Sequence, residues 1–171
     1  MPQGQYPAIL AGEAFTASLV QSFAPLFAWK ASDESVTSSV TLQNDNDLYL
    51  PVAANAVYRF DCYLDYEAAA GAATGITWGW TGPSGYTLRY HLLDVTTGSS
   101  PTPNVGSTKQ GTDTPSAGGT GAAALMGVSM RGTLFTAAAS GILQLQWAQA
   151  SSSATATIVH GQSYLELARR A

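Results

Sequence analysis

The feature that most constrains the fold is a strict alternation of apolar and polar residues over residues 55–66. Apolar or aromatic side chains occupy every second position: Tyr58, Phe60, Cys62, Leu64 and Tyr66. Because successive side chains of a strand point to opposite faces, these residues form one continuous apolar face. The pattern predicts a central strand with one face in a core and the other facing water or a polar neighbour.

The same two-residue periodicity recurs through the rest of the chain. The predicted strands span residues 26–31, 36–43, 48–52, 57–66, 76–81, 87–95, 128–136, 142–148 and 155–167, the last broken at Gly161. Turn clusters such as Gly82-Pro83-Ser84-Gly85 separate them, and no helical pattern lies between. About nine closely spaced strands predict an all-β fold, an antiparallel β-sandwich of jelly-roll type over residues 26–171.

Residues 97–124 interrupt this rhythm. They hold six glycines, three prolines and, apart from Val105, no large apolar residue. Loops of this length are uncommon in compact domains and are usually functional or mobile. We therefore expect a long surface loop at one end of the sandwich, which either contacts a partner subunit or a ligand or is a flexible insertion.

Residues 1–25 have a different pattern. Thr16 can cap a short helix that Pro25 ends, and an apolar stripe runs along one face of that helix. The stripe consists of Phe15, Leu19, Val20 and Phe23. Because so short a helix is unstable alone, it must dock either on its own domain as a lid or on a partner as an anchor. We interpret residues 1–25 as an N-terminal docking segment, helical or extended.

The composition excludes several kinds of partner. Charged residues make up 11% of the chain, against roughly 25% in ordinary soluble domains. The net charge is −4 and only seven Lys and Arg are present, which predicts no nucleic-acid binding. No segment approaches the roughly 18 apolar residues that span a bilayer, so we expect no membrane partner. The N-terminus lacks the pattern of a signal peptide, which predicts synthesis and folding in a cytoplasm.

The chain offers few groups for chemistry. Its two histidines, His91 and His160, lie within predicted strands, and no HExxH, paired CxxC, GxSxG or phosphate-binding loop is present. We therefore expect a protein that is not an enzyme and needs no cofactor. Asp45 and Asp47, in Asn44-Asp45-Asn46-Asp47, carry oxygen ligands that suit calcium, but tight turns use the same residues. We expect no metal site and keep these two as the candidates.

The tryptophans lie on predicted apolar faces. Trp78 and Trp80 share a face with Ile76, and Trp147 follows two leucines at the same spacing. This placement favours core or subunit contacts. Aromatic rings also stack on sugars, and Tyr86 and Tyr90 are the more exposed candidates for glycan contact.

Several strand segments resemble a family of small virion structural proteins from tailed phages of high-GC Gram-positive bacteria. The similar segments are residues 36–48 (VTSSVTLQNDNDL), 52–58 (VAANAVY), 130–134 (MRGTL) and 143–149 (LQLQWAQ). The opening from Ala11 to Leu19 is similar to the segments that precede many tail-fibre and minor-tail modules. The resemblance implies a minor tail or fibre-type protein of the virion, made in the bacterial host and bound to other virion proteins.

A second resemblance concerns shape. Residues 55–60 (NAVYRF) and 161–167 (GQSYLEL) are similar to strands of the C1q and tumour-necrosis-factor jelly rolls. That resemblance implies a homo-oligomer, most simply a trimer, with the aromatic face of one sheet around the threefold axis. Two alternatives remain open: a capsid decoration protein or head fibre, and a carbohydrate-binding module that contacts host-surface glycans.

Overall fold

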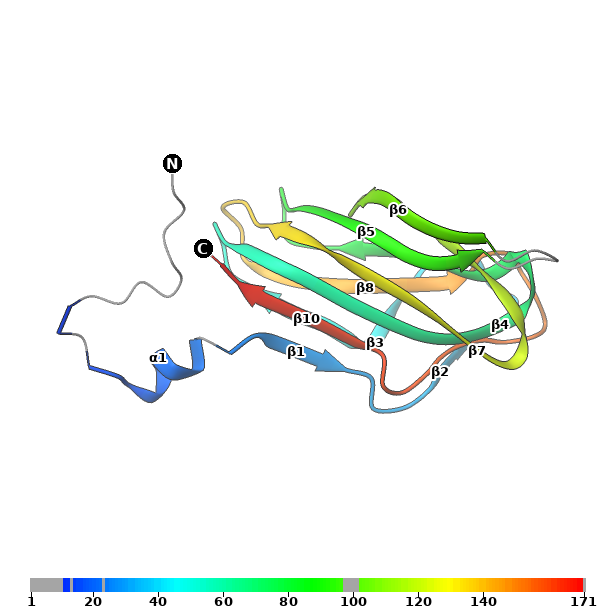
Figure 1. Ribbon diagram of the computed structural model, residues 1–171, viewed down its shortest axis with the longest axis horizontal. Coiled ribbons are helices and arrows are strands. Elements are labelled where there is room, and N and C mark those ends of the chain that lie inside the picture. The colour runs from blue at the N-terminus through cyan, green and yellow to red at the C-terminus, as the bar shows by residue number, and fades with distance from the viewer. Residues whose placement is uncertain (1–10, 13, 23, 97–101, 171) are drawn as a thin grey trace.

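The chain folds into antiparallel strands after one short helix (Figure 1). The computed structural model describes residues 11–12, 14–22, 24–96 and 102–170. Its elements are α1 (Ala17–Ser22), β1 (Leu26–Trp29), β2 (Glu34–Val36), β3 (Gln43–Val52), β4 (Val57–Thr81), β5 (Thr87–Thr96), β6 (Thr102–Gln110), β7 (Ser116–Phe135), β8 (Gly141–Gln149), β9 (Thr157–Val159) and β10 (Tyr164–Arg169). The predicted all-β sandwich of jelly-roll type is confirmed.

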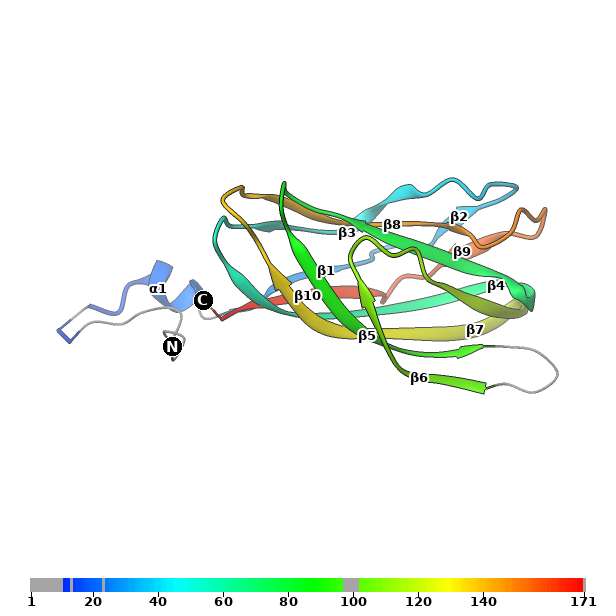
Figure 2. The same cartoon turned by 90° about the horizontal axis from the view of Figure 1, so that it is seen from above.

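The strands form two layers, which Figure 2 shows edge-on. In one layer the order is β1, β10, β4, β7, β5 and β6, with β1 and β6 at its edges. In the other, β3 pairs with β8 and β8 pairs with the second half of β4, while the short strands β2 and β9 pair with each other. All of these pairings are antiparallel.

The long strands β4 and β7 connect the two layers. Residues 57–66 of β4 pair with 126–135 of β7, and residues 58–63 also pair with β10. Residues 76–81 pair with β8, while residues 76 and 77 also pair with the start of β7. Between these halves the register with β7 shifts three times, at the bend from one layer to the other. The backbones are close there: a Cβ on Gly119 would lie 2.2 Å from the carbonyl oxygen of Ala69, and one on Gly75 1.8 Å from that of Ala117. Only glycine fits these positions.

Two predictions about this architecture are wrong. Residues 97–124 are not a long loop, because β6 and the first part of β7 lie within them. Their small residues reflect the close backbone approach at the bend and the pairing of β6 with β5. The predicted strand at residues 36–43 is also absent, since β2 ends at Val36 and β3 begins at Gln43. Its apolar residue Val40 is exposed.

The core lies between the layers and contains the alternating face on which the fold prediction rests. Tyr58, Phe60, Cys62, Leu64 and Tyr66 are all buried. The Phe60 ring meets Trp80, from the second half of β4, edge-on at a centroid distance of 5.1 Å. Burial raises the pKa of the Cys62 thiol well above its usual value, so this cysteine is an unreactive part of the core.

The helix α1 lies beyond the end of the sandwich and covers neither layer (Figures 1 and 2). The backbone N–H of Leu19 donates to the Thr16 hydroxyl at 3.2 Å, so the predicted cap is present. No helix in the described part of the chain is long and apolar enough to cross a membrane.

Candidate functional site

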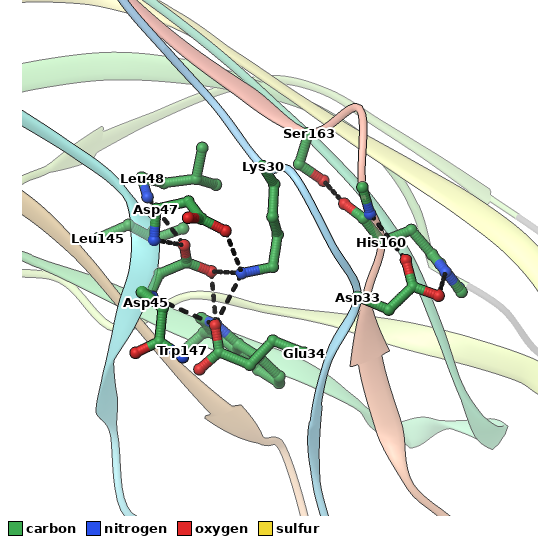
Figure 3. Close-up of polar contacts among 12 residues, drawn as sticks. Lys30, Asp33, Glu34, Asp45, Asp47, Leu48, Leu145, Trp147, His160 and Ser163 are labelled. Atoms are coloured by element: carbon green, nitrogen blue, oxygen red, sulfur yellow. Dashed lines mark hydrogen bonds and ion pairs between the residues drawn. The ribbon is translucent and has the colours of Figure 1, made fainter.

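A buried charge network lies beside the end of β1 (Figure 3). Lys30 is 1% exposed, and its Nζ lies 2.9 Å from Asp45 Oδ2 and 2.7 Å from Glu34 Oε2. Burial opposes the charge of the ammonium, but the hydrogen bonds and charges of Glu34 and Asp45 outweigh it and raise the pKa of Lys30. The network therefore keeps Lys30 charged and holds three chain segments together.

Both carboxylate oxygens of Asp45 accept hydrogen bonds in this network. Its Oδ1 accepts the backbone N–H groups of Asp47 and Leu48 at 2.9 and 2.8 Å, and its Oδ2 accepts the indole N–H of Trp147 at 3.0 Å. Asp47 lies 3.7 Å from the same Lys30 ammonium. The two candidate metal ligands thus lie beside a lysine ammonium. The described residues contain no group of three or more His, Cys, Asp or Glu that could hold a metal ion.

Two turns pack against each other next to the network, one after β1 and one between β9 and β10. The backbone N–H of Lys30 donates to the Ser163 carbonyl at 2.8 Å, and that of Gln162 donates to the Lys30 carbonyl at 3.1 Å. Asp33 Oδ1 accepts the Gly161 N–H at 2.8 Å. These bonds fix the positions of the side chains that the turns carry.

Asp33, His160 and Ser163 lie close together in these turns but do not form a catalytic triad. His160 Nδ1 lies 3.1 Å from Asp33 Oδ2, and the Gly161 and His160 contacts lower the pKa of Asp33. The Ser163 hydroxyl, however, is buried and donates to the His160 carbonyl oxygen at 2.9 Å (Figure 3). A nucleophile must contact the ring of its base and reach the substrate, and Ser163 does neither.

A pocket of about 430 Å³ opens to solvent between these turns and the neighbouring strands. We call it the β1 pocket. Its wall includes Trp29, Asp33, Asp65, Leu125, His160 and Gln162. None of these was among the predicted site residues. The sequence offered two signals, the histidine His160 within a predicted strand and a tryptophan that precedes a charged turn.

The outward side of the layer that contains β1, β10, β4, β7 and β5 is rich in apolar groups. We call it the outer face. Nine large apolar side chains are exposed in the described part of the chain, and five of them lie on this face: Phe27, Trp29, Leu93, Leu125 and Phe135. Tyr164 stacks on Phe27 at a centroid distance of 5.8 Å and contacts Tyr63 at 6.1 Å.

Charges at the centre of the outer face neutralise one another. Arg59 pairs with Glu166, and Arg131 Nε lies 3.0 Å from Asp61 Oδ2. Such exposed pairs add little stability. They do leave the centre of the face without excess charge, which lowers the repulsion between two such faces.

The predicted glycan contacts are not supported by their positions. Tyr90 is 1% exposed and therefore belongs to the core, so its predicted exposure is wrong. Tyr86 is half-buried, and its hydroxyl donates to the Trp80 carbonyl at 2.8 Å. The predicted core placement of Trp78, Trp80 and Trp147 is confirmed, since all three are buried.

The predicted docking residues are described only in part. Phe15 is 73% exposed, and Leu19 is half-buried in α1. The side chain of Val20 and the whole of Phe23 lie outside the described residues. The docking role of this stripe remains a prediction.

No family model and no curated protein sequence matches the chain. Among solved structures, the chain is similar to one in "Structure of infectious bursal disease virus Gt strain", with 13% identity and a TM-score of 0.22. The match covers 85% of this chain and 42% of that one, so the chain spans less than half of its length.

Proposed function

We propose that the chain is a non-enzymatic structural protein of a phage virion, of the minor tail or fibre type, that assembles through its outer face as a homo-oligomer. The observation that carries the assembly is the outer face itself. The virion setting comes from the resemblance of residues 36–48, 52–58, 130–134 and 143–149 to phage structural proteins.

The outer face has the properties of a subunit interface. Large exposed apolar patches mark interaction sites in soluble proteins, and aromatic residues are enriched there. The central ion pairs satisfy their own charges, so a second copy can cover them without bringing a matching charge. The favoured assembly is a trimer.

The non-enzymatic part of the proposal rests on the use of the charged groups. Lys30, Asp45 and Glu34 are bound to one another, and the serine nearest to His160 is bound to the backbone. These groups serve the fold and its turns.

Oligomer size tests the assembly role. Sedimentation velocity of the purified full chain should give a trimer, and Leu93→Glu should give a folded monomer because it places a charge in the covered face. Ile142→Glu is the matched control, since Ile142 is 51% exposed and Leu93 is 52% exposed, but Ile142 lies in the other layer. A monomeric parent, or equal dissociation by both variants, would contradict the proposal. Immuno-electron microscopy of particles then distinguishes tail from capsid.

A further inference from the structure

The β1 pocket has one aromatic wall that the fold does not require. Trp29, the last residue of β1, is 62% exposed, whereas the other three tryptophans are at most 5% exposed. Leu125, 66% exposed on β7, also lines the pocket. Exposure of an indole ring to water is unfavourable in free energy, and a ligand that covers the ring gains the free energy of burying it. Ligand pockets are accordingly lined by aromatic side chains.

Polar groups without internal partners lie in the same pocket. Within the described part of the chain, the Asp65 carboxylate and the Gln162 side-chain amide make no hydrogen bond or ion pair with the protein. The carboxylate offers acceptors and the amide offers both donors and an acceptor. Both groups are therefore available to a ligand that carries hydroxyl groups.

The turn that presents Gln162 is held in an unfavourable conformation. Gln162 has a φ of 78°, in the left-handed region that non-glycine residues rarely adopt. Its backbone N–H is bound to the Lys30 carbonyl, and Lys30 is fixed by the buried network. Strained residues that the surroundings hold in place cluster at binding sites. The turn is preorganised, so little ordering is needed when a ligand binds.

We propose that the β1 pocket binds a pyranose unit of a neutral or amino-substituted glycan. The Trp29 ring stacks on the apolar C–H face of the sugar, while Asp65 and Gln162 bind its hydroxyl groups. Asp33 and Asp65 make the pocket repel acidic sugars and accept an amino group. Its volume of about 430 Å³ lies within the range of small-ligand pockets. The site would suit host-surface contact by a virion protein, and it requires that Trp29 and Leu125, which also belong to the outer face, stay uncovered in the assembly proposed above.

Intrinsic tryptophan fluorescence tests the proposal directly, because Trp29 is the exposed tryptophan. The purified full chain is titrated with trimers of glucose, galactose, N-acetylglucosamine and glucosamine, and with trigalacturonate as the acidic counterpart of the galactose trimer. We expect a saturable blue shift, and protection from acrylamide quenching, with at least one of the first four. Trigalacturonate should give no response.

Variants assign the binding to the pocket. Trp29→Ala should weaken it roughly tenfold or more, as loss of a central aromatic contact does, and Trp29→Phe should restore most of it. For these variants isothermal titration calorimetry replaces fluorescence. Asp65→Asn and Gln162→Gly should also weaken binding, the latter while relieving strain and keeping the fold stable. Phe27→Ala is the matched control, since Phe27 is 55% exposed on the same strand outside the pocket.

The proposal is overturned if none of the four trimers gives a saturable response at millimolar concentration. It is equally overturned if trigalacturonate binds best, or if Phe27→Ala weakens binding as much as Trp29→Ala. The same titration of the Leu93→Glu variant keeps this outcome separate from that of the assembly. If sedimentation shows that this variant is a monomer and it still gives no response, the pocket alone is contradicted, because its outer face is uncovered.

Discussion

Lys30 is the residue on which the local structure next to the β1 pocket depends. Its ammonium contacts carboxylates from β2 and β3. Its backbone forms hydrogen bonds with the backbones of Gln162 and Ser163 in the β9–β10 turn. A buried ion pair is weak evidence for net stability, because desolvation offsets much of the attraction. Breaking such a pair is costly all the same, since the remaining charge has no partner.

We predict that Lys30→Met destabilises the fold by about 3 to 5 kcal/mol, because it leaves Asp45 charged and buried without its cation. Urea denaturation measures the loss. The double variant Lys30→Met/Asp45→Asn should lose less than the sum of the two single variants, because it removes the unpaired charge. Additive losses would show that the two side chains are not coupled.

The pH dependence of the same variants gives a control. Because the pKa of Lys30 is raised in the fold, its charge stabilises the protein fully below the ordinary value of about 10.5. This stabilisation is lost as the pH rises through the raised pKa. Lys30→Met should lack that part of the alkaline decline, which separates it from the titration of tyrosines.

At the scale of elements, the ribbon of β4 and β7 decides the architecture. Its two ends lie in different layers, and the bend between them contains small residues on both strands. Side chains at the bend would force the strands apart, so the glycines there are required by packing. Residues 102–110 and 116–124 are therefore part of the sheet, and shortening the segment 97–124 to a turn should unfold the protein.

We predict that Gly119→Val destabilises the protein by about 3 kcal/mol or more, because its Cβ would collide with backbone atoms that no rotamer change can move. Thermal unfolding followed by circular dichroism measures the change. Gly161→Ala is the matched control, since nothing lies within 3.6 Å of its Cβ position. An equal change in both midpoints would mean that the bend is not tightly packed.

At the scale of the whole molecule, the helix α1 lies at one end of the sandwich, where Gln21 and Ser22 line a pocket together with Val52 and Tyr58. β1 begins at Leu26, and α1 lies beyond the end of both layers (Figure 1). We predict that removal of residues 1–25 leaves a folded sandwich that no longer enters virions, because the 73% exposed Phe15 offers apolar surface that another chain can cover. Circular dichroism tests the fold, and copy number in purified particles tests incorporation.

Two outcomes would contradict this anchor. Truncated protein that loads at the parental copy number would show that attachment lies on the sandwich. An unfolded truncation product would show instead that residues 1–25 belong to the core.

The sequence by itself determined the class of fold, the inner face of the central strand and the placement of three tryptophans. These features depend on local alternation, since a two-residue period with aromatic and β-branched residues can bury one face only as a strand. The break at Gly161 and the Thr16 cap are local in the same sense. The short-range pattern of side chains is sufficient for each of them.

The tertiary structure alone decided the bend, the buried network and the β1 pocket. Small residues at the bend carry no periodic signal, because their function is to let two distant backbones approach. Asp45 and Asp47 are residue types found both in tight turns and in metal-binding loops. They form an ion-pair network because the fold places Lys30, the residue after β1, next to them. Trp29, Asp65 and Gln162 come from three strands and turns far apart in sequence, and the pairing of β1, β10 and β4 places them around one pocket.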